Sequence, residues 1–270
     1  MKSINRLFLL ILVFIVCSCS NNPNDPNNPV NTFPNLSLIN ANPDYDASYF
    51  GVYKGIIGDS TNTGNILIDF NNSQSTAKAY ITFRGSQLIL SQTDIANVSG
   101  VITVTLEKDN QVVKLRVGGI GNNPTISYIS LNGSVEYGST ILKEKSTNKV
   151  KCFEGKYNSN TSTCGAFVNV PIGILIFGQD AQMLLYAKSQ FTVGSGYYYF
   201  TTDYDINTQE IKLTALDVPV SAGYKIYINV NGDVMNNNAA GTYDFYIAQS
   251  IYGLGMLCES EGYWTSTKTL

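Results

Sequence analysis

Apolar and polar positions alternate along most of the chain from Tyr45 onward. Within 101–107, for example, Ile102, Val104 and Leu106 share one face of an extended chain, and mostly polar residues occupy the other face. This period of two is typical of antiparallel strands that bury one face and expose the other to solvent. The clearest such segments, each expected to be a strand, are 65–70, 79–84, 101–107, 113–117 and 224–230. We therefore predict an all-β fold.

Turn signals and one ambiguous segment refine this prediction. Asn132-Gly133 and Asn231-Gly232 suit type I′ hairpin turns, in which both central residues need a positive φ. The segment 180–188 is rich in helix formers behind a capping Asp, which makes it the best helix candidate. An internal repeat of the chain favours a strand over 180–188 instead.

A weak internal repeat divides the chain. Tyr53-Lys54-Gly55 leads through a Ser/Thr/Asn-rich turn into a strand, and Phe153-Glu154-Gly155 does the same 100 residues later. The repeat also sets 77–84 beside 181–188, both of which we expect to be strands. It predicts two antiparallel units in tandem, each a β-sandwich or a small barrel, over these ranges: 45–148 and 149–270. A single larger sheet that spans the chain is the alternative.

The N-terminus has the layout of a lipoprotein signal peptide. Lys2 and Arg6 precede an unbroken apolar run over 7–16. A membrane-spanning helix needs about 20 apolar residues, so this run is too short to span and matches the core of a signal peptide. The motif Val16-Cys17-Ser18-Cys19 resembles a bacterial lipobox. The resemblance implies cleavage before Cys19 and attachment of diacylglycerol to its thiol, which radioactive palmitate would label; an ordinary secretory peptide is the alternative.

Two N-terminal parts are therefore expected: a signal peptide over 1–18 and a flexible spacer over 19–44. The spacer is rich in Asn and Pro and cannot bury enough apolar surface to offset its ordering entropy. A structured arm that docks through Phe33 and 36–39 is the alternative. Ser20 follows the lipidated Cys where an Asp would signal retention in the inner membrane, so the resemblance favours an outer-membrane lipoprotein. Its periplasmic and external sides both stay open.

Short motifs around the start of each unit are similar to those of uncharacterised tandem all-β lipoproteins of Bacteroidota. In that group a GxYKG strand opens the first half, and a KExS…VKxxEGxY stretch joins the halves. The corresponding segments here are 50–55 (FGVYKG), 142–146 (LKEKS) and 150–157 (VKCFEGKY). The resemblance implies the location in the cell envelope and the tandem architecture, and it implies no activity.

Composition and charge narrow the chemistry. The 270 residues include no His, which excludes Ser-His-Asp and Cys-His nucleophile pairs and every His-ligated metal site. The net charge of −3, from 20 acidic and 17 basic residues, lacks the basic excess of a protein that binds a phosphate backbone, so no nucleic acid partner is expected. We expect no cofactor and lean against an enzyme. A glycosidase that uses two carboxylates needs no His and stays open as a less favoured alternative.

Three cysteines follow the lipidated Cys19, an odd number for an oxidising compartment. A hairpin folded about residue 158 would bring Cys152 and Cys164 together, so this pair is the favoured disulfide. Pairing of Cys152 with Cys258 is the rival, since it would join the first and last strands of the second unit. A catalytic Cys is least expected because no His can activate it.

A weak calcium candidate lies in the second unit. Asp203, Asp205 and Asn207 alternate like the ligands of a calcium loop, but the Gly and Glu that an EF-hand loop needs are replaced by Thr208 and Thr214. Asp, Asn and Thr also bond their own backbone in tight turns. We therefore predict a polar hairpin turn and no metal site.

Tyrosines are concentrated in the second unit, and they carry the functional prediction. If Tyr198 and Phe200 point inward, Tyr197 and Tyr199 present their rings outward, near Tyr227. Exposed aromatic pairs suit stacking on sugars or on partner surfaces, although Tyr also packs commonly within sheets. We predict a non-catalytic binding or interaction module for a glycan or an envelope protein. The alternative is a lipocalin-like carrier, whose hollow barrel would hold a small apolar ligand.

Overall fold

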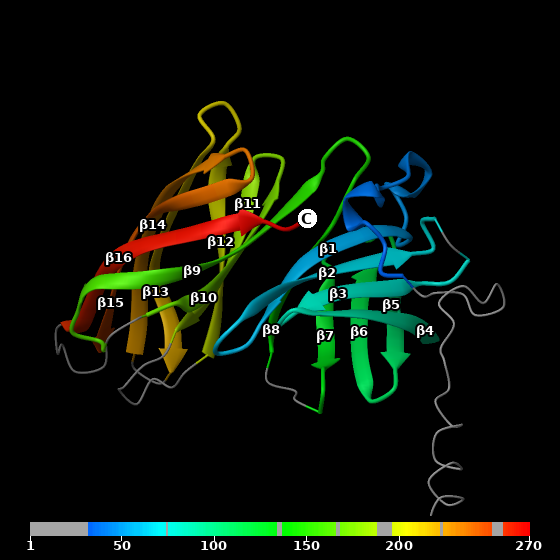
Figure 1. Ribbon diagram of the computed structural model, residues 1–270, viewed down its shortest axis with the longest axis horizontal. Helices are drawn as coiled ribbons and strands as arrows, with labels where there is room; N and C mark the ends of the chain where they lie inside the picture. The colour runs from blue at the N-terminus through cyan, green and yellow to red at the C-terminus, as the bar shows by residue number, and fades with distance from the viewer. Residues whose placement is uncertain are drawn as a thin grey trace, which may run out of the picture. The chain divides into compact units, whose positions relative to one another are not determined.

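The structure, a computed structural model, describes residues 32–73, 75–133, 137–165, 168–187, 196–221, 224–249 and 256–270. Within them, two short 3-10 turns, η1 (Leu36–Leu38) and η2 (Pro43–Tyr45), precede sixteen β-strands. The strands form two antiparallel eight-stranded sheets, one of which is a closed barrel (Figure 1). The prediction of tandem all-β units is confirmed.

The predicted signal peptide and Cys19 lie outside the described residues. In the part of the chain that the structure describes, no helix has the length and apolar character of a membrane span.

The first sheet follows the chain in a simple meander. Its strands are β1 (Gly51–Gly58), β2 (Thr63–Phe70), β3 (Lys78–Phe83), β4 (Ser86–Val98), β5 (Val101–Lys108), β6 (Gln111–Gly118), β7 (Thr125–Ser130) and β8 (Gly138–Lys143). Strands β1 to β7 pair in chain order, and β8 returns to pair with the other side of β1. No ladder joins β7 to β8 among the described residues, so these strands are the two edges of a curled, barrel-like sheet (Figure 1).

The second sheet repeats the meander and closes. Its strands are β9 (Val150–Ser162), β10 (Val170–Phe177), β11 (Asp180–Ala187), β12 (Gly196–Asp205), β13 (Glu210–Ser221), β14 (Tyr224–Met235), β15 (Asn238–Gln249) and β16 (Met256–Lys268). Strand β16 pairs with β9, which completes the ring. The segment that competed between helix and strand is β11, so the strand predicted from the repeat is confirmed.

Each unit encloses its own apolar core. Alternation sends Ile66, Ile68 and Phe70 of β2 into the first core and Met183 of β11 into the second. The second core is richer in large aromatic side chains, which include the fully buried Trp264. Burial of alternate side chains against a common centre is what holds each curled sheet together.

Neither predicted hairpin turn joins two paired strands. Asn132 and Gly133 form a turn after β7 with the predicted positive φ values, 53° and 78°, but no ladder joins β7 to β8 among the described residues. Asn231-Gly232 instead lies inside β14, and the chain turns further on, at Asn236, where φ is 56°. A glycine at position 232 leaves room for the indole ring of Trp264, because a Cβ there would come within 3.0 Å of Cη2 of Trp264.

The outer faces of the two units pack against each other through a third apolar cluster. Ile56 of β1 belongs to one buried cluster with Cys152 of β9, Leu175 of β10 and Leu184 of β11, and β1 contacts all three of these strands. Gly173 of β10 allows this approach, since a Cβ there would lie 3.1 Å from Cβ of Ile56. The two sheets thus form one compact body over Asn35–Leu270.

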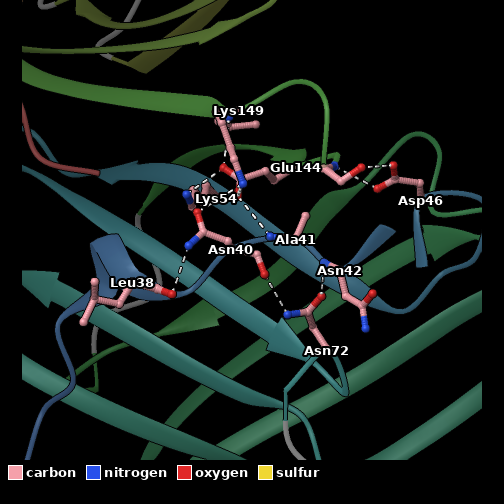
Figure 2. A network of polar contacts seen from close by, with 11 residues as sticks. Leu38, Asn40, Ala41, Asn42, Asp46, Lys54, Asn72, Glu144 and Lys149 are labelled. Carbon is pink, nitrogen blue, oxygen red and sulfur yellow. Dashed lines mark hydrogen bonds and ion pairs between the residues drawn. The ribbon is translucent and has the colours of Figure 1, made fainter. Parts of the chain in front are cut away.

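The last part of the expected spacer is folded, which corrects its predicted extent. From Asn35 onward the chain belongs to the compact body, and the structured-arm alternative applies there. The amide N–H of Ala41 donates to Oε1 of Glu144 at 3.3 Å, and the amide N–H of Asn42 donates to Oδ1 of Asn72 at 2.8 Å (Figure 2). These backbone groups find partners in the first unit, so this stretch does not depend on burying apolar surface alone.

Candidate functional site

Two rows of side chains cross the outer face of the barrel over β14, β15, β16 and β9. Ile228 of β14 is buried in the core, so its neighbour Tyr227 points outward. The strand register sets Tyr227 opposite Tyr246 on β15, and Tyr246 opposite Glu259 on β16. The rings of Tyr227 and Tyr246 are stacked, with centroids 4.4 Å apart and planes inclined by 11°.

The second row is polar and hydrogen-bonded. Asn229, Asp244, Glu261 and Thr161 face one another in that order across the four strands. Nδ2 of Asn229 donates to Oδ2 of Asp244 at 2.9 Å, and Oγ1 of Thr161 donates to Oε1 of Glu261 at 3.0 Å. Two exposed carboxylates therefore lie side by side, each held by a neutral donor, with acceptor capacity left over.

A cleft of about 570 Å³ lies over these rows. Its lining residues are Asn160, Thr161, Thr242, Tyr243, Asp244, Phe245, Tyr246, Glu259, Ser260, Glu261 and Gly262. One aromatic wall among several hydroxyl, amide and carboxylate groups is the composition of a site that orients a polar ligand.

A disulfide and two hydrogen bonds connect β16, at the rim of the cleft, to the segment that follows β9. A disulfide joins Cys164 to Cys258, the residue before Glu259. The amide N–H of Thr163 donates to the carbonyl of Glu259, and the amide N–H of Glu259 donates to Oγ1 of Thr163, both at 2.9 Å. The covalent and hydrogen-bonded links together hold β16 against the segment after β9.

This pairing corrects the predicted disulfide. Neither Cys152–Cys164 nor its rival Cys152–Cys258 forms, and Cys152 is a free, buried thiol whose pKa is raised by burial. The predicted hairpin about residue 158 does not exist, because β9 continues as one strand to Ser162. At about 3.3 Å per residue, Cys152 and Cys164 stand up to roughly 40 Å apart along the chain.

The predicted tyrosine platform is only partly described. The backbone of Tyr197 and Tyr199 lies in β12, but their side chains lie outside the described residues. Tyr227 belongs to β14, which β13 separates from β12. Among the described residues, the stacking partner of Tyr227 is Tyr246.

The wrong turn prediction at Asn231-Gly232 explains why the sequence did not point to Tyr246 as a site residue. A hairpin at Asn231-Gly232 would set Tyr227 opposite Asn236, on the far side of a two-residue loop. The true turn, after Met235, sets Tyr227 opposite Tyr246. The alternation of 238–249 and its flanking Asn residues are the sequence signal that could have given this register.

The calcium candidate is a hairpin turn, as expected. Oδ1 of Asp205 accepts the amide N–H groups of Asn207 at 2.8 Å and of Thr208 at 3.3 Å, and these bonds lower the pKa of Asp205. Asp203 is exposed and lies on β12 opposite Lys212. Within the described ranges, no group of three or more acidic or Cys side chains is placed to hold a metal ion.

The motifs that resemble the lipoprotein group form a buried network at the junction of the two units (Figure 2). Nζ of Lys54 lies 2.6 Å from Oε2 of the fully buried Glu144, and Nζ of Lys149 lies 3.5 Å from Oε1. The amide N–H groups of Ala41 and Val150 also donate to Glu144, at 3.3 and 3.1 Å. The carboxylate of Glu144 therefore links the N-terminal stretch, β1 and the start of β9.

Two neighbouring motif residues fix the loops around this junction. Lys143 donates from Nζ to the carbonyls of Tyr45, Asp46 and Ser48. Ser146 donates to Asp46 from its amide at 2.9 Å and from its hydroxyl at 2.6 Å, and these bonds lower the pKa of Asp46. These residues are buried or internally bonded, so they build the junction and offer no open site.

A second cleft, of about 540 Å³, lies in the seam between β7 and β8 of the first unit. Its lining residues are Asn123, Pro124, Thr125, Ile126, Tyr137, Ser139, Thr140, Ile141, Leu142 and Gln182. Oγ1 of Thr140 donates to Oε1 of Gln182 at 2.7 Å, which links β8 to β11 across the cleft.

Comparison of the chain with protein-family models, with curated proteins and with solved structures finds no match.

Proposed function

We propose that this protein is an outer-membrane lipoprotein and a non-catalytic binding module, whose barrel binds a glycan in the cleft over β15, β16 and β9. The ring of Tyr246, which lines that cleft and is stacked on Tyr227, is the observation that supports this most directly. An aromatic ring packs on the apolar face of a sugar and loses little rotamer freedom in doing so. The carboxylates of Asp244 and Glu261 supply acceptors for sugar hydroxyls.

Binding is favoured over glycoside hydrolysis by the exposure of these carboxylates. A glycosidase needs one carboxyl that its surroundings keep protonated beside another that stays ionised. Asp244 and Glu261 are instead both exposed, and each accepts a hydrogen bond from a neutral donor.

Binding at the outer surface is also favoured over a lipocalin-like carrier. The inward positions of the barrel hold large side chains that pack together, among them Phe153, Tyr157, Tyr243 and Trp264. The rings of Tyr157 and Tyr243 meet edge to face with centroids 5.1 Å apart. These side chains occupy space that an enclosed apolar ligand would need.

A glycan array tests the proposal with matched tyrosine variants. Tyr246→Ala should weaken binding of any glycan that the wild type retains by about tenfold, which corresponds to about 1.4 kcal/mol. Tyr128→Ala is the control, because Tyr128 is 43% exposed but lies on β7 of the other unit. Absence of glycan binding by the wild type, or equal binding by Tyr246→Ala, would refute the assignment.

The lipid anchor is tested separately. Cells grown with radioactive palmitate should label the wild-type protein and leave Cys19→Ala unlabelled. Equal labelling of the two proteins would remove the anchor from the proposal while leaving the glycan site to be judged by its own test.

A further inference from the structure

A buried amide and a buried carboxyl meet where the first sheet and the barrel pack together. Asn65 lies on the outer face of β2 and is 4% exposed. Its Nδ2 donates to Oε1 of Glu154, on β9, at 2.9 Å. This bond joins two strands that belong to different units, next to the apolar cluster around Ile56.

The other atom of the Asn65 carboxamide lacks a partner. Oδ1 is buried, and no donor of the described residues reaches it. A buried acceptor left without a donor costs about 1–3 kcal/mol, so native proteins rarely tolerate one. The group that already shares one hydrogen bond with this amide is the carboxyl of Glu154, and a carboxyl can donate only when it carries a proton.

We propose that Glu154 is protonated in the folded protein and donates its proton to Oδ1 of Asn65. The carboxyl and the carboxamide then form a cyclic pair with two hydrogen bonds, which acts as a proton-dependent latch between β9 of the barrel and β2 of the sheet. The proton is taken from solvent on folding and is returned when the contact opens. Ionisation of Glu154 removes the donor and places a negative charge in the interface.

The surroundings of Glu154 favour the protonated form. Burial raises the pKa of Glu154, which outweighs the opposing effect of its side-chain hydrogen bonds with Asn65 and Thr269. Two residues before it on β9 is Cys152, and the charged groups that act on this thiol are Lys54 of β1, Glu144 of the link, Lys268 of β16 and Glu154 itself. Lys54 is committed to Glu144 at 2.6 Å, and burial raises the pKa of the Cys152 thiol, which keeps it neutral.

The sign of the pH effect follows from the raised pKa. Below the ordinary pKa of a glutamate both the folded and the unfolded states hold the proton, and the latch contributes fully. As the pH rises from that value through the raised pKa of folded Glu154, the unfolded state ionises first and the contribution is lost. The latch is therefore tighter at acidic pH and weaker at alkaline pH.

Carbon-13 NMR of the Glu154 side-chain carboxyl in the full wild-type chain tests the protonation directly. The carboxyl should titrate at a higher pH than the carboxyl of an unstructured glutamate peptide measured in the same buffer. A Glu154 that titrates together with the peptide would overturn the proposal and would mean that a bound water satisfies Asn65.

Unfolding by urea across the same pH range tests the latch. Glu154→Gln keeps a neutral donor and acceptor in place, so its urea midpoint should lose the pH dependence that Glu154 causes, and the wild-type midpoint should fall relative to it as pH rises. Glu259→Gln is the matched control and should follow the wild type. Parallel curves for the wild type and Glu154→Gln would overturn the latch, and the NMR titration decides the protonation even if the variant does not fold.

Discussion

The two β units share one plan and differ at the contact between their seventh and eighth strands. In the barrel, β15 and β16 are 12 and 13 residues long and pair along nearly their whole length. In the first sheet, β7 and β8 are 6 residues each and share no ladder among the described residues. Each unit has a cleft at this position, over the ladder in the barrel and in the open seam of the sheet.

The same meander of eight strands therefore forms a closed barrel when its last strands are long and an open sheet when they are short. Long strands supply enough hydrogen bonds to complete the ring, and closure removes both sheet edges. The open unit keeps two edges and relies instead on its packing against the barrel and on the N-terminal stretch. The barrel alone adds a disulfide beside its closing ladder.

Removing that disulfide should give the largest effect. Cys164 and Cys258 are 94 residues apart, and closing a loop of that length stabilises by about 4.7 kcal/mol in the chain-entropy model. Cys164→Ser, Cys258→Ser and the double variant should each lower the free energy of unfolding by about that amount, measured by urea denaturation.

Two controls accompany this measurement. Reduction of the wild type should match the double variant, and reduction of the double variant should change nothing. A wild type whose stability does not respond to reduction would show that the β9–β16 ladder closes the barrel without the disulfide.

Disrupting the junction between the units should give the next largest effect. Glu144→Gln leaves the buried ammonium of Lys54 without its counter-charge, and breaking a buried ion pair costs about 3–5 kcal/mol. Glu210→Gln breaks the exposed pair between Glu210 and Lys212, whose side chains are 40% and 65% exposed, and should lower the free energy of unfolding far less. Equal losses in these two variants would mean that Glu144 does not couple the units.

Period-two alternation was enough to predict most of the fold. It places strands at β2, β3, β5 and β6, and the repeat correctly turns 180–188 from a helix candidate into β11. It could not separate a closed barrel from an open sheet, because closure depends on strand length and on pairing between residues far apart in the chain. The spacer was predicted to be too long for a related reason. The backbone N–H groups of Ala41 and Asn42 donate hydrogen bonds to the first unit, and composition does not reveal these bonds.

The candidate site was harder to predict because it depends on register. Tyr227 was singled out from the sequence, whereas Tyr246, Asp244 and Glu261 join it only through the pairing of β14, β15 and β16. The single error at Asn231-Gly232 was enough to hide all three. The predicted disulfide was wrong for a similar reason. A turn was expected at residue 158, where β9 continues as one strand.

The glycines of the internal repeat should give the smallest effect and the closest comparison of the two units. Gly55 and Gly155 occupy matching places on β1 and β9, beside the last strand of each unit. A Cβ at Gly55 would meet the backbone carbonyl of Thr140 and lie 3.0 Å from Cβ of Ile141, and a Cβ at Gly155 would meet the backbone carbonyl of Thr265 and lie 2.5 Å from Cβ of Ser266. Overpacking of this kind costs about 1–3 kcal/mol.

We expect Gly155→Ala to approach the upper end of that range and Gly55→Ala the lower end, because the closed ring prevents β16 from moving away while β8 has a free edge. Gly119→Ala is the control, since the nearest atom to its Cβ would be 3.8 Å away and the change should be small. Urea denaturation of the three variants measures the difference. A larger loss for Gly55→Ala than for Gly155→Ala would contradict the idea that closure makes the barrel the less adaptable of the two units.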